Sequence, residues 1–208
     1  MRVERIERSQ RKQERVLVYL EGGDLLRITE DELLRFGLYA GLDIGPGAVV
    51  ELKKAAARSE IRIRAAGMLS ARPLSKRELQ KRLLDKGASE EDAADAADWL
   101  EGMGALDALA YARTVVRHYS ESGYGEAKLR DELYRRGVPR ALWDEALAGA
   151  PEARETIARV AAARLKGRAL DERERKKLAA LLLRRGFSWQ DVRAALAAYE
   201  EETQWQEI

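Results

Sequence analysis

The sequence is poor in reactive and membrane-forming features. Its 208 residues include no cysteine, which excludes disulfides, thiolate nucleophiles and zinc sites built on cysteine. No apolar run approaches the roughly 18 residues of a membrane-spanning helix. The N-terminal segment M-R-V-E-R-I-E-R is charged, whereas a secretory signal would have an apolar core. We therefore expect a soluble cytoplasmic protein without a membrane segment.

Signatures of catalysis and of metal binding are also missing. The single histidine, His118, has no catalytic serine or acid beside it, so we expect an ordinary surface side chain. Gly123-Tyr124-Gly125 lacks the lysine and hydroxyl residue of a phosphate-binding loop. The carboxylates from Glu90 to Glu101 lack the glycine and alternating ligands of a calcium loop, which favours a solvated helix face. The sequence therefore predicts no enzyme, no metal site and no cofactor.

What the chain does contain is a repeated helix. The segment S-K-R-E-L-Q-K-R-L-L-D-K-G, Ser75 to Gly87, has a serine N-cap, a capping-box glutamate and two leucines on one face. The pattern L-x-x-x-L-x-x-[KR]-G recurs after 50 and again after 49 residues. Repeats of this length are typical of helical arrays. Each copy ends on a glycine that can adopt the positive φ of a helix stop; the predicted stops are Gly87, Gly137 and Gly186.

The predicted fold is mainly α: tandem three-helix repeats form an elongated curved array behind a small N-terminal α+β module. The module, 1–54, has the pattern of a three-stranded meander plus a short helix with a Thr29–Glu32 capping box. The first helix of repeat one is expected from Ala55 to Ala71, after a break at Gly45-Pro46-Gly47. The repeats cover 55–104, 105–150 and 151–200, and an acidic tail covers 201–208.

Large aromatic rings are few, at 6% of the chain. Trp99, Trp143 and Trp189 fall in or beside the predicted third helices of the repeats. Because large rings dominate core burial, we expect them to anchor helix packing rather than to form a ligand cage.

Charge is segregated along the chain, although the net charge is only +2. Residues 72–87 carry six basic and two acidic side chains, residues 88–101 carry six acidic and no basic ones, and residues 173–185 carry six basic and one acidic. A solvated face usually mixes both signs, so the basic second helices are the candidate partner-binding surface. The candidate residues are Arg77, Lys81, Arg82, Lys86, Lys128, Arg130, Arg135, Arg136, Lys176, Lys177, Arg184 and Arg185.

The residues alone leave the partner of this surface open. Cationic strips bind phosphates or an acidic protein surface. Single-stranded nucleic acid would also need aromatic platforms, and only Tyr124 and Tyr134 lie on or beside these helices, which favours a protein or nucleoprotein partner. Lys86, Arg136 and Arg185 have a purely structural explanation as well, because a cation in the last turn stabilises the helix dipole.

Three stretches of the sequence resemble the RecX family, bacterial regulators of the RecA recombinase. Ser75–Gly87 is close to the first-repeat signature of that family. Its second repeat is resembled by three short segments, which are Leu106-Asp107, Tyr111-Ala112-Arg113 and the run G-Y-G-E-A-K-L-R-D-E-L from Gly123 to Leu133. R-R-G-F-S, from Arg184 to Ser188, resembles its third glycine turn.

The resemblance implies a regulator that lies in the groove of a RecA filament on single-stranded DNA. We separately expect the protein to be a monomer. Family members inhibit ATP hydrolysis, strand exchange and coprotease activity, which affects homologous recombination, DNA repair and the SOS response, and they have no catalytic residues. A weak direct contact with DNA is left open. Ala105, Ala108 and Asp85 depart from the family pattern, the first two in a turn. The alternative is a sequence-independent nucleic-acid-binding helical repeat protein that acts by competition for DNA.

Overall fold

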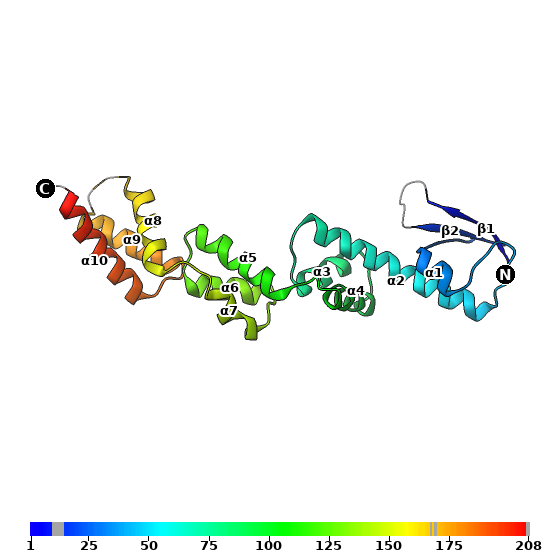
Figure 1. The fold of residues 1–208 in the computed structure, drawn as a ribbon. Helices are drawn as coiled ribbons and strands as arrows, with labels where there is room; N and C mark the ends of the chain where they lie inside the picture. The colour runs from blue at the N-terminus through cyan, green and yellow to red at the C-terminus, as the bar shows by residue number, and fades with distance from the viewer. Residues whose placement is uncertain (10–14, 167, 169, 207–208) are drawn as a thin grey trace. The chain divides into compact units, whose positions relative to one another are not determined.

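The computed structural model describes residues 1–9, 15–166, 168 and 170–206 (Figure 1). These residues are mostly helical, with a three-stranded antiparallel sheet near the N-terminus, which confirms the predicted fold class. The chain divides into two compact units. The first comprises Met1–Pro73 and Leu79–Leu106, and the second comprises Leu74–Glu78 and the chain from Asp107 onward.

The N-terminal sheet is the predicted meander, with strand order β1-β2-β3. Val16, Val18 and Leu20 alternate toward the core and are buried, as expected for a strand with one covered face. Thr29 caps the following short helix through the predicted capping box with Glu32. The elements are β1 (Val3–Arg8), β2 (Val16–Leu20), β3 (Leu25–Ile28) and α1 (Glu30–Arg35).

A single long helix, α2 (Pro46–Ala71), joins this module to the first repeat. It contacts α1 and β3 as well as α4, so that the module and the first repeat form one unit. The expected helix start at Ala55 was wrong by nine residues. Pro46 does not break the chain but occupies the first helical turn, where its missing N–H costs nothing.

The repeats follow the predicted register. The pattern leucines of all three second helices are at most 2% exposed, so each pair packs into the core. The third helix of repeat two begins as a 3-10 turn, η1. The helix α10 continues to Gln206, through most of the expected tail, and residues 207 and 208 lie outside the described part of the chain. The helices are α3 (Lys76–Asp85), α4 (Glu90–Gly102), α5 (Ala108–Glu121), α6 (Glu126–Arg135), η1 (Arg140–Leu142), α7 (Trp143–Leu147), α8 (Ala153–Leu165), α9 (Glu172–Arg184) and α10 (Trp189–Gln206).

The three pattern glycines end their helices in the left-handed region. Their φ angles are +86° at Gly87, +70° at Gly137 and +90° at Gly186. The next residue closes each turn by donating its backbone N–H to the carbonyl of the second pattern leucine, as in a Schellman motif.

Two of these glycines also permit a close approach between repeats of the second unit. A Cβ on Gly186 would lie 2.6 Å from the backbone nitrogen of Lys128, in the first turn of α6. A Cβ on Gly137 would lie 2.5 Å from the side chain of Arg77. A Cβ on Gly87 would meet nothing within 4 Å. The glycine turn therefore ends its own helix in every repeat. In repeats two and three it also lets a residue from the second helix of the preceding repeat pack against the glycine.

The tryptophans differ in their surroundings. Trp143 is buried, and its indole N–H donates to the carbonyl of Val138 at 3.0 Å, as expected for a packing anchor. Trp99 is half-buried, with the Arg62 guanidinium 5.3 Å from its ring centroid. The expectation for Trp189 was wrong: it is 62% exposed, because the first residue of α10 faces away from the core that Val192 and Leu196 enter.

Candidate interaction surface

The first basic helix, α3, and the residue after it carry four candidate cations that have no acidic partner among the described residues. Ser75 and Glu78 form the predicted capping box, with two reciprocal hydrogen bonds of 3.0 Å. Glu78 also accepts from the Tyr111 hydroxyl at 2.6 Å; burial and this hydrogen bond raise the pKa of Tyr111. The hydrogen bonds from the Ser75 backbone N–H and the Tyr111 hydroxyl are accepted by the same carboxylate oxygen, Oε2 of Glu78. Among the described residues, no carboxylate forms an ion pair with the α3 candidates Arg77, Lys81, Arg82 and Lys86.

Two of these cations line an open cavity of about 650 Å³ in the first unit. Arg82 contributes from α3 and Lys86 from the turn directly after it, and Arg64 and Arg72 contribute from α2 and the residue that follows it. The Arg64 guanidinium donates to the Lys86 carbonyl at 3.3 Å. Sequence reasoning missed Arg64 and Arg72, because it searched for cations along one helix rather than across two. We name this cavity, lined by Arg64, Gly67, Met68, Ala71, Arg72, Arg82 and Lys86, the α2–α3 basin.

The second basic helix, α6, differs because its cations are paired within the helix. Glu132, whose side chain is only 9% exposed, lies between Lys128, at 2.7 Å, and Arg136, with which it also forms an ion pair. Burial alone would raise the pKa of Glu132, but hydrogen bonds from Lys128 and Arg136 outweigh it and lower the pKa to about 2. Arg136 also donates to the Tyr119 hydroxyl at 3.2 Å. These residues form a closed, charge-compensated ladder.

The two remaining α6 candidates are paired on the surface. Arg130 contacts Glu126 at 2.8 Å and Asp144 at 3.1 Å, and Arg135 contacts Asp131 at 3.1 Å. The interpretation of three similar cationic strips therefore does not hold for α6. Its exposed ion pairs contribute little to stability, but they reduce the positive charge that a partner would meet.

The third basic helix, α9, is intermediate. Lys176 pairs with Glu172 at 3.2 Å, and Lys177 pairs with Glu174 at 2.8 Å. Arg184 is exposed and has no acidic partner among the described residues. Arg185 donates to the Gly123 carbonyl at 3.3 Å and lies 5.6 Å from the ring centroid of Tyr124, so it links the repeats.

An exposed apolar residue occupies the same repeat position on all three second helices. Leu84 is 41% exposed, Tyr134 is 66% exposed and Leu183 is 40% exposed. Each directly follows the second buried leucine of the pattern, and each precedes the cation at the helix end by two residues. Sequence reasoning noted Tyr134 as an aromatic residue on these helices but overlooked Leu84 and Leu183, and with them the shared position, which lies directly after the buried leucine pair of the repeat pattern. Large exposed apolar side chains next to cations are typical of binding surfaces.

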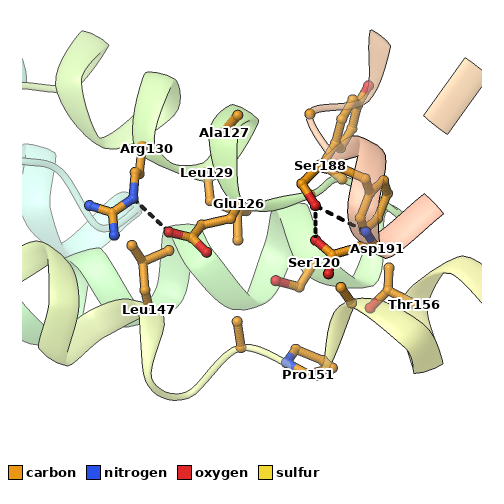
Figure 2. A pocket seen from close by; sticks show the side chains of 16 residues that line it. Ser120, Glu126, Ala127, Leu129, Arg130, Leu147, Pro151, Thr156, Ser188 and Asp191 are labelled. Atoms are coloured by element: carbon orange, nitrogen blue, oxygen red, sulfur yellow. Dashed lines mark hydrogen bonds and ion pairs between the residues drawn. The ribbon is translucent and has the colours of Figure 1, made fainter. Parts of the chain in front are cut away.

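A second cavity, of about 450 Å³, lies in the second unit where repeats two and three meet (Figure 2). The Ser120 hydroxyl is buried there and has no hydrogen-bond partner among the described residues. Asp191 accepts from the Ser188 hydroxyl at 2.6 Å, and Glu126 accepts from Arg130 at 2.8 Å, so both carboxylates are occupied (Figure 2). We therefore regard the cavity as a junction between repeats rather than a charged site.

In the described part of the chain, no group of three or more histidine, cysteine or carboxylate side chains is placed to hold a metal ion. None of the described helices is both long and apolar enough to cross a membrane.

Comparison with known proteins places the chain in a family. A family model described as RecX, second three-helix domain, matches residues 109–147, which include most of α5, all of α6 and all of α7. The regulatory protein RecX of Chromohalobacter salexigens is 35% identical over 137 residues, which cover 65% of this chain and 90% of that protein. The chain belongs to the RecX family. The RecX of Vibrio campbellii is 34% identical over 119 residues, which cover 56% of this chain and 77% of the relative.

The RecX fold extends over nearly the whole chain. A crystal structure of regulatory protein RecX superposes with a TM-score of 0.78 at 22% identity, covering 94% of this chain and 98% of the other. The crystal structure of RecX from Lactobacillus salivarius gives 0.61 at 19% identity, covering 69% and 97%. The resemblance found in the sequence is thus confirmed, and this RecX-family member is a regulatory protein.

Proposed function

We propose that this RecX-family protein binds the RecA filament on single-stranded DNA and inhibits its ATP hydrolysis, strand exchange and coprotease activity. The observation that carries the proposal is the repeated surface of α3, α6 and α9. Each of these helices presents one exposed apolar residue, Leu84, Tyr134 or Leu183, near its C-terminal cations. This recurrence supports a partner that also repeats.

A filament is such a partner, because it presents the same subunit surface again and again. Three equivalent patches on one chain can each engage a neighbouring subunit, and the second and third contacts then benefit from a high effective concentration. Individually weak patches can in this way give tight binding. A ligand that spans several subunits in turn opposes the subunit movements that ATP hydrolysis requires, which accounts for inhibition.

The direct test is DNA-dependent ATP hydrolysis by RecA of the host, with and without the purified protein. We expect turnover to fall at stoichiometric or lower ratios. Unchanged turnover at saturating protein would contradict the proposal. Hydrolysis by the protein alone would contradict the expectation that it is not an enzyme.

A matched pair of variants tests the repeated apolar position. Tyr134→Ala removes the ring from α6, and Tyr39→Ala removes a ring of similar exposure, 61% against 66%, from the N-terminal module. Truncation of an interface hot spot costs about 2 kcal/mol or more, which corresponds to roughly 30-fold weaker binding. We expect that loss for Tyr134→Ala in co-sedimentation with preformed RecA–DNA filaments. Equal binding of the two variants would remove α6 from the interface.

Competition for DNA is the alternative, and the carboxylate-free α2–α3 basin is the observation that favours it. Inhibition by competition should fall steeply with salt and should be relieved by excess single-stranded DNA, whereas filament binding should depend on RecA. Measuring inhibition at two salt concentrations and two DNA concentrations separates these mechanisms.

A further inference from the structure

The cavity of about 450 Å³ between repeats two and three, which we call the junction cavity, contains a buried hydroxyl group without a partner (Figure 2). Ser120 is 3% exposed, and no described residue forms a hydrogen bond with its hydroxyl. Thr114 and Ser122, on and directly after the same helix, each donate to the carbonyl four residues earlier at 2.9 Å. Ser120 does not make this bond, and its side chain is directed into the cavity instead (Figure 2). Because an unmade hydrogen bond in a buried group is unfavourable, the cavity lacks a partner for this hydroxyl.

A single water molecule would satisfy Ser120 but would leave most of the junction cavity empty. One water occupies about 30 Å³ in the liquid, and the cavity volume lies within the range of about 300–1,000 Å³ that is usual for ligand sites. Much of the lining is apolar, since Leu129 and Phe187 are buried there and Leu147 and Pro151 complete the wall. Protein interiors are otherwise close-packed. The cavity therefore suits a ligand with a sizeable apolar body.

Two of the helices that line the junction cavity begin there without a side-chain cap. These are α6, which begins at Glu126, and α8, which begins at Ala153; neither has a side-chain hydrogen bond at its N-cap in the described part of the chain. In α6 the Ala127 N–H donates to the Gly186 carbonyl at 3.1 Å. The first N–H groups of α8 have no partner within the helix. Together with Ser120, these donors favour a ligand that carries a hydrogen-bond acceptor.

The charges at the junction cavity nearly cancel. Glu126 and Asp191 are negative and Arg130 is positive, and the N-termini of α6, α8 and α10 each contribute about half a positive charge. Both carboxylates are also engaged, Glu126 by Arg130 and Asp191 by the Ser188 hydroxyl. A charged ligand would upset this balance, so the cavity favours an uncharged one.

We propose that the junction cavity binds an uncharged phenol group, which is an aromatic ring that carries one hydroxyl. The ring matches the apolar wall, where Phe187 and Tyr124 offer aromatic contacts. The hydroxyl can accept from a backbone N–H or from Ser120, and it can also donate. A plain phenyl ring would leave Ser120 unpaired, and an indole offers only a donor. The site does not involve RecA, so it can fail without affecting the proposed filament binding.

The test compares three small probes on the full-length protein. The first probe is p-cresol, which has the phenol of a tyrosine side chain, and the second is toluene, which lacks the hydroxyl. Binding is followed by NMR titration of the backbone amides of Ser120, Ala153 and Phe187. We expect p-cresol to bind about fivefold more tightly than toluene, because one net hydrogen bond contributes about this factor. Equal affinities would show an apolar void without polar recognition, and no binding up to the solubility limit would exclude the site. The third probe is the anion 4-methylbenzoate; if it bound more tightly than p-cresol, the cavity would be an anion site and the proposal would be wrong.

Two serine variants isolate the role of the buried hydroxyl. Ser120→Ala removes it, and the control Ser122→Ala removes an exposed hydroxyl that bonds to the His118 carbonyl. Ser120→Ala should reduce the affinity for p-cresol to that for toluene and leave toluene binding unchanged, whereas Ser122→Ala should change neither. A preference for p-cresol that persists in Ser120→Ala would overturn the proposal.

A third variant tests the location of the site. Ala153→Leu extends a side chain of α8 at the cavity wall, and it should weaken both p-cresol and toluene by about tenfold or more, because the added atoms occupy the volume of the ligand. Thermal melting followed by circular dichroism establishes that the variant is folded. Unchanged affinities in the folded variant would place the probes elsewhere and overturn the proposal.

A capped amino acid distinguishes the two sources of a phenol. N-acetyl-tyrosinamide carries the same group on a peptide backbone. Binding at least as tight as that of p-cresol would support a tyrosine side chain of a protein partner. Binding of p-cresol alone would support a free phenolic ligand, because the peptide groups would then be excluded from the cavity. Failure of both to bind would overturn the proposal.

Discussion

The helices α3 and α6 occupy equivalent places in repeats one and two, yet they use charge in opposite ways. Counting from the same repeat position, α3 carries Glu78, Arg82 and Lys86, and the corresponding residues of α6 have the order cation, carboxylate, cation. In α3 the carboxylate stands first and is held by the Ser75 backbone N–H and the Tyr111 hydroxyl. Its two cations are left without an acidic partner, among the described residues.

In α6 the carboxylate stands in the middle and satisfies both neighbours. Glu132 pairs with Lys128 one turn before it and with Arg136 one turn after it. Similar numbers of basic residues therefore produce an open cationic surface on one helix and a closed structural ladder on the other. The position of the acid, rather than the count of cations, decides whether a basic helix can meet an anionic partner.

The largest expected effect comes from removing the acid of the α6 ladder. Glu132→Gln leaves Arg136 without its carboxylate partner in a partly buried site, whereas Lys128 keeps its ion pair with Asp131 at 3.1 Å. Breaking a buried ion pair on one side costs about 3–5 kcal/mol, and we expect a loss in this range in chemical denaturation. The matched control is Glu126→Gln, which removes an exposed pair with Arg130 and should cost about 1 kcal/mol or less. Equal losses would mean that the ladder is an ordinary surface network.

Acid should weaken the same ladder. The pKa of Glu132 is lowered from 4.5 to about 2, so its contribution to stability is fully present above pH 4.5 and is lost as the pH falls toward 2. A shift of this size corresponds to at most about 3 kcal/mol. We expect the free energy of unfolding to fall more steeply between pH 4.5 and 2 for the wild type than for Glu132→Gln. Parallel pH curves would contradict the assigned ion pairs.

The helical repeats were predictable because their signals are local. The buried leucines, the capping box at Ser75 and the left-handed glycines follow from spacing of three and four residues and from backbone conformation, and all are present. The start of α2 was missed for a local reason too, since Gly45-Pro46-Gly47 is compatible with both a break and a helix N-terminus.

The candidate surface was less predictable because its properties depend on contacts between helices. Sequence showed that Arg130 is basic, but not that Asp144, from another helix, would pair with it. The α2–α3 basin brings together Arg64, from α2, and Lys86, from the turn directly after α3. The two residues are 22 positions apart, so no helical periodicity in the sequence relates them. The expected burial of Trp189 was wrong because the direction of the first side chain of a helix depends on the conformation of the preceding turn, which the sequence pattern does not give.

The glycine turns of repeats one and three also differ, in what packs against the glycine. Gly87 and Gly186 have nearly the same φ, +86° and +90°, but only Gly186 carries the first turn of another helix. Alanine at either position incurs the cost of the left-handed conformation, about 1–2 kcal/mol. At Gly186 the new Cβ also collides with the Lys128 backbone, and overpacking adds about 1–3 kcal/mol. We expect Gly186→Ala to lower the melting temperature clearly more than Gly87→Ala. Equal shifts would show that the Lys128 backbone moves away from the new Cβ at no cost in stability.

The smallest effect is expected for Arg82→Glu. This substitution gives α3 the carboxylate that α6 has at the equivalent position. The new glutamate can pair with Lys86 one turn later, in the favourable acid-before-base order, which is worth about 0.2–0.5 kcal/mol. The unfolding free energy should therefore exceed that of Arg82→Gln by a few tenths of a kcal/mol, and both variants should remain within about 0.5 kcal/mol of the wild type. Denaturant titrations with circular dichroism measure this difference. A loss above about 1 kcal/mol in both variants would mean that Arg82 has a structural partner. The cations of α3 would then stabilise the fold, as the ion-paired Lys128 and Arg136 do in the second repeat.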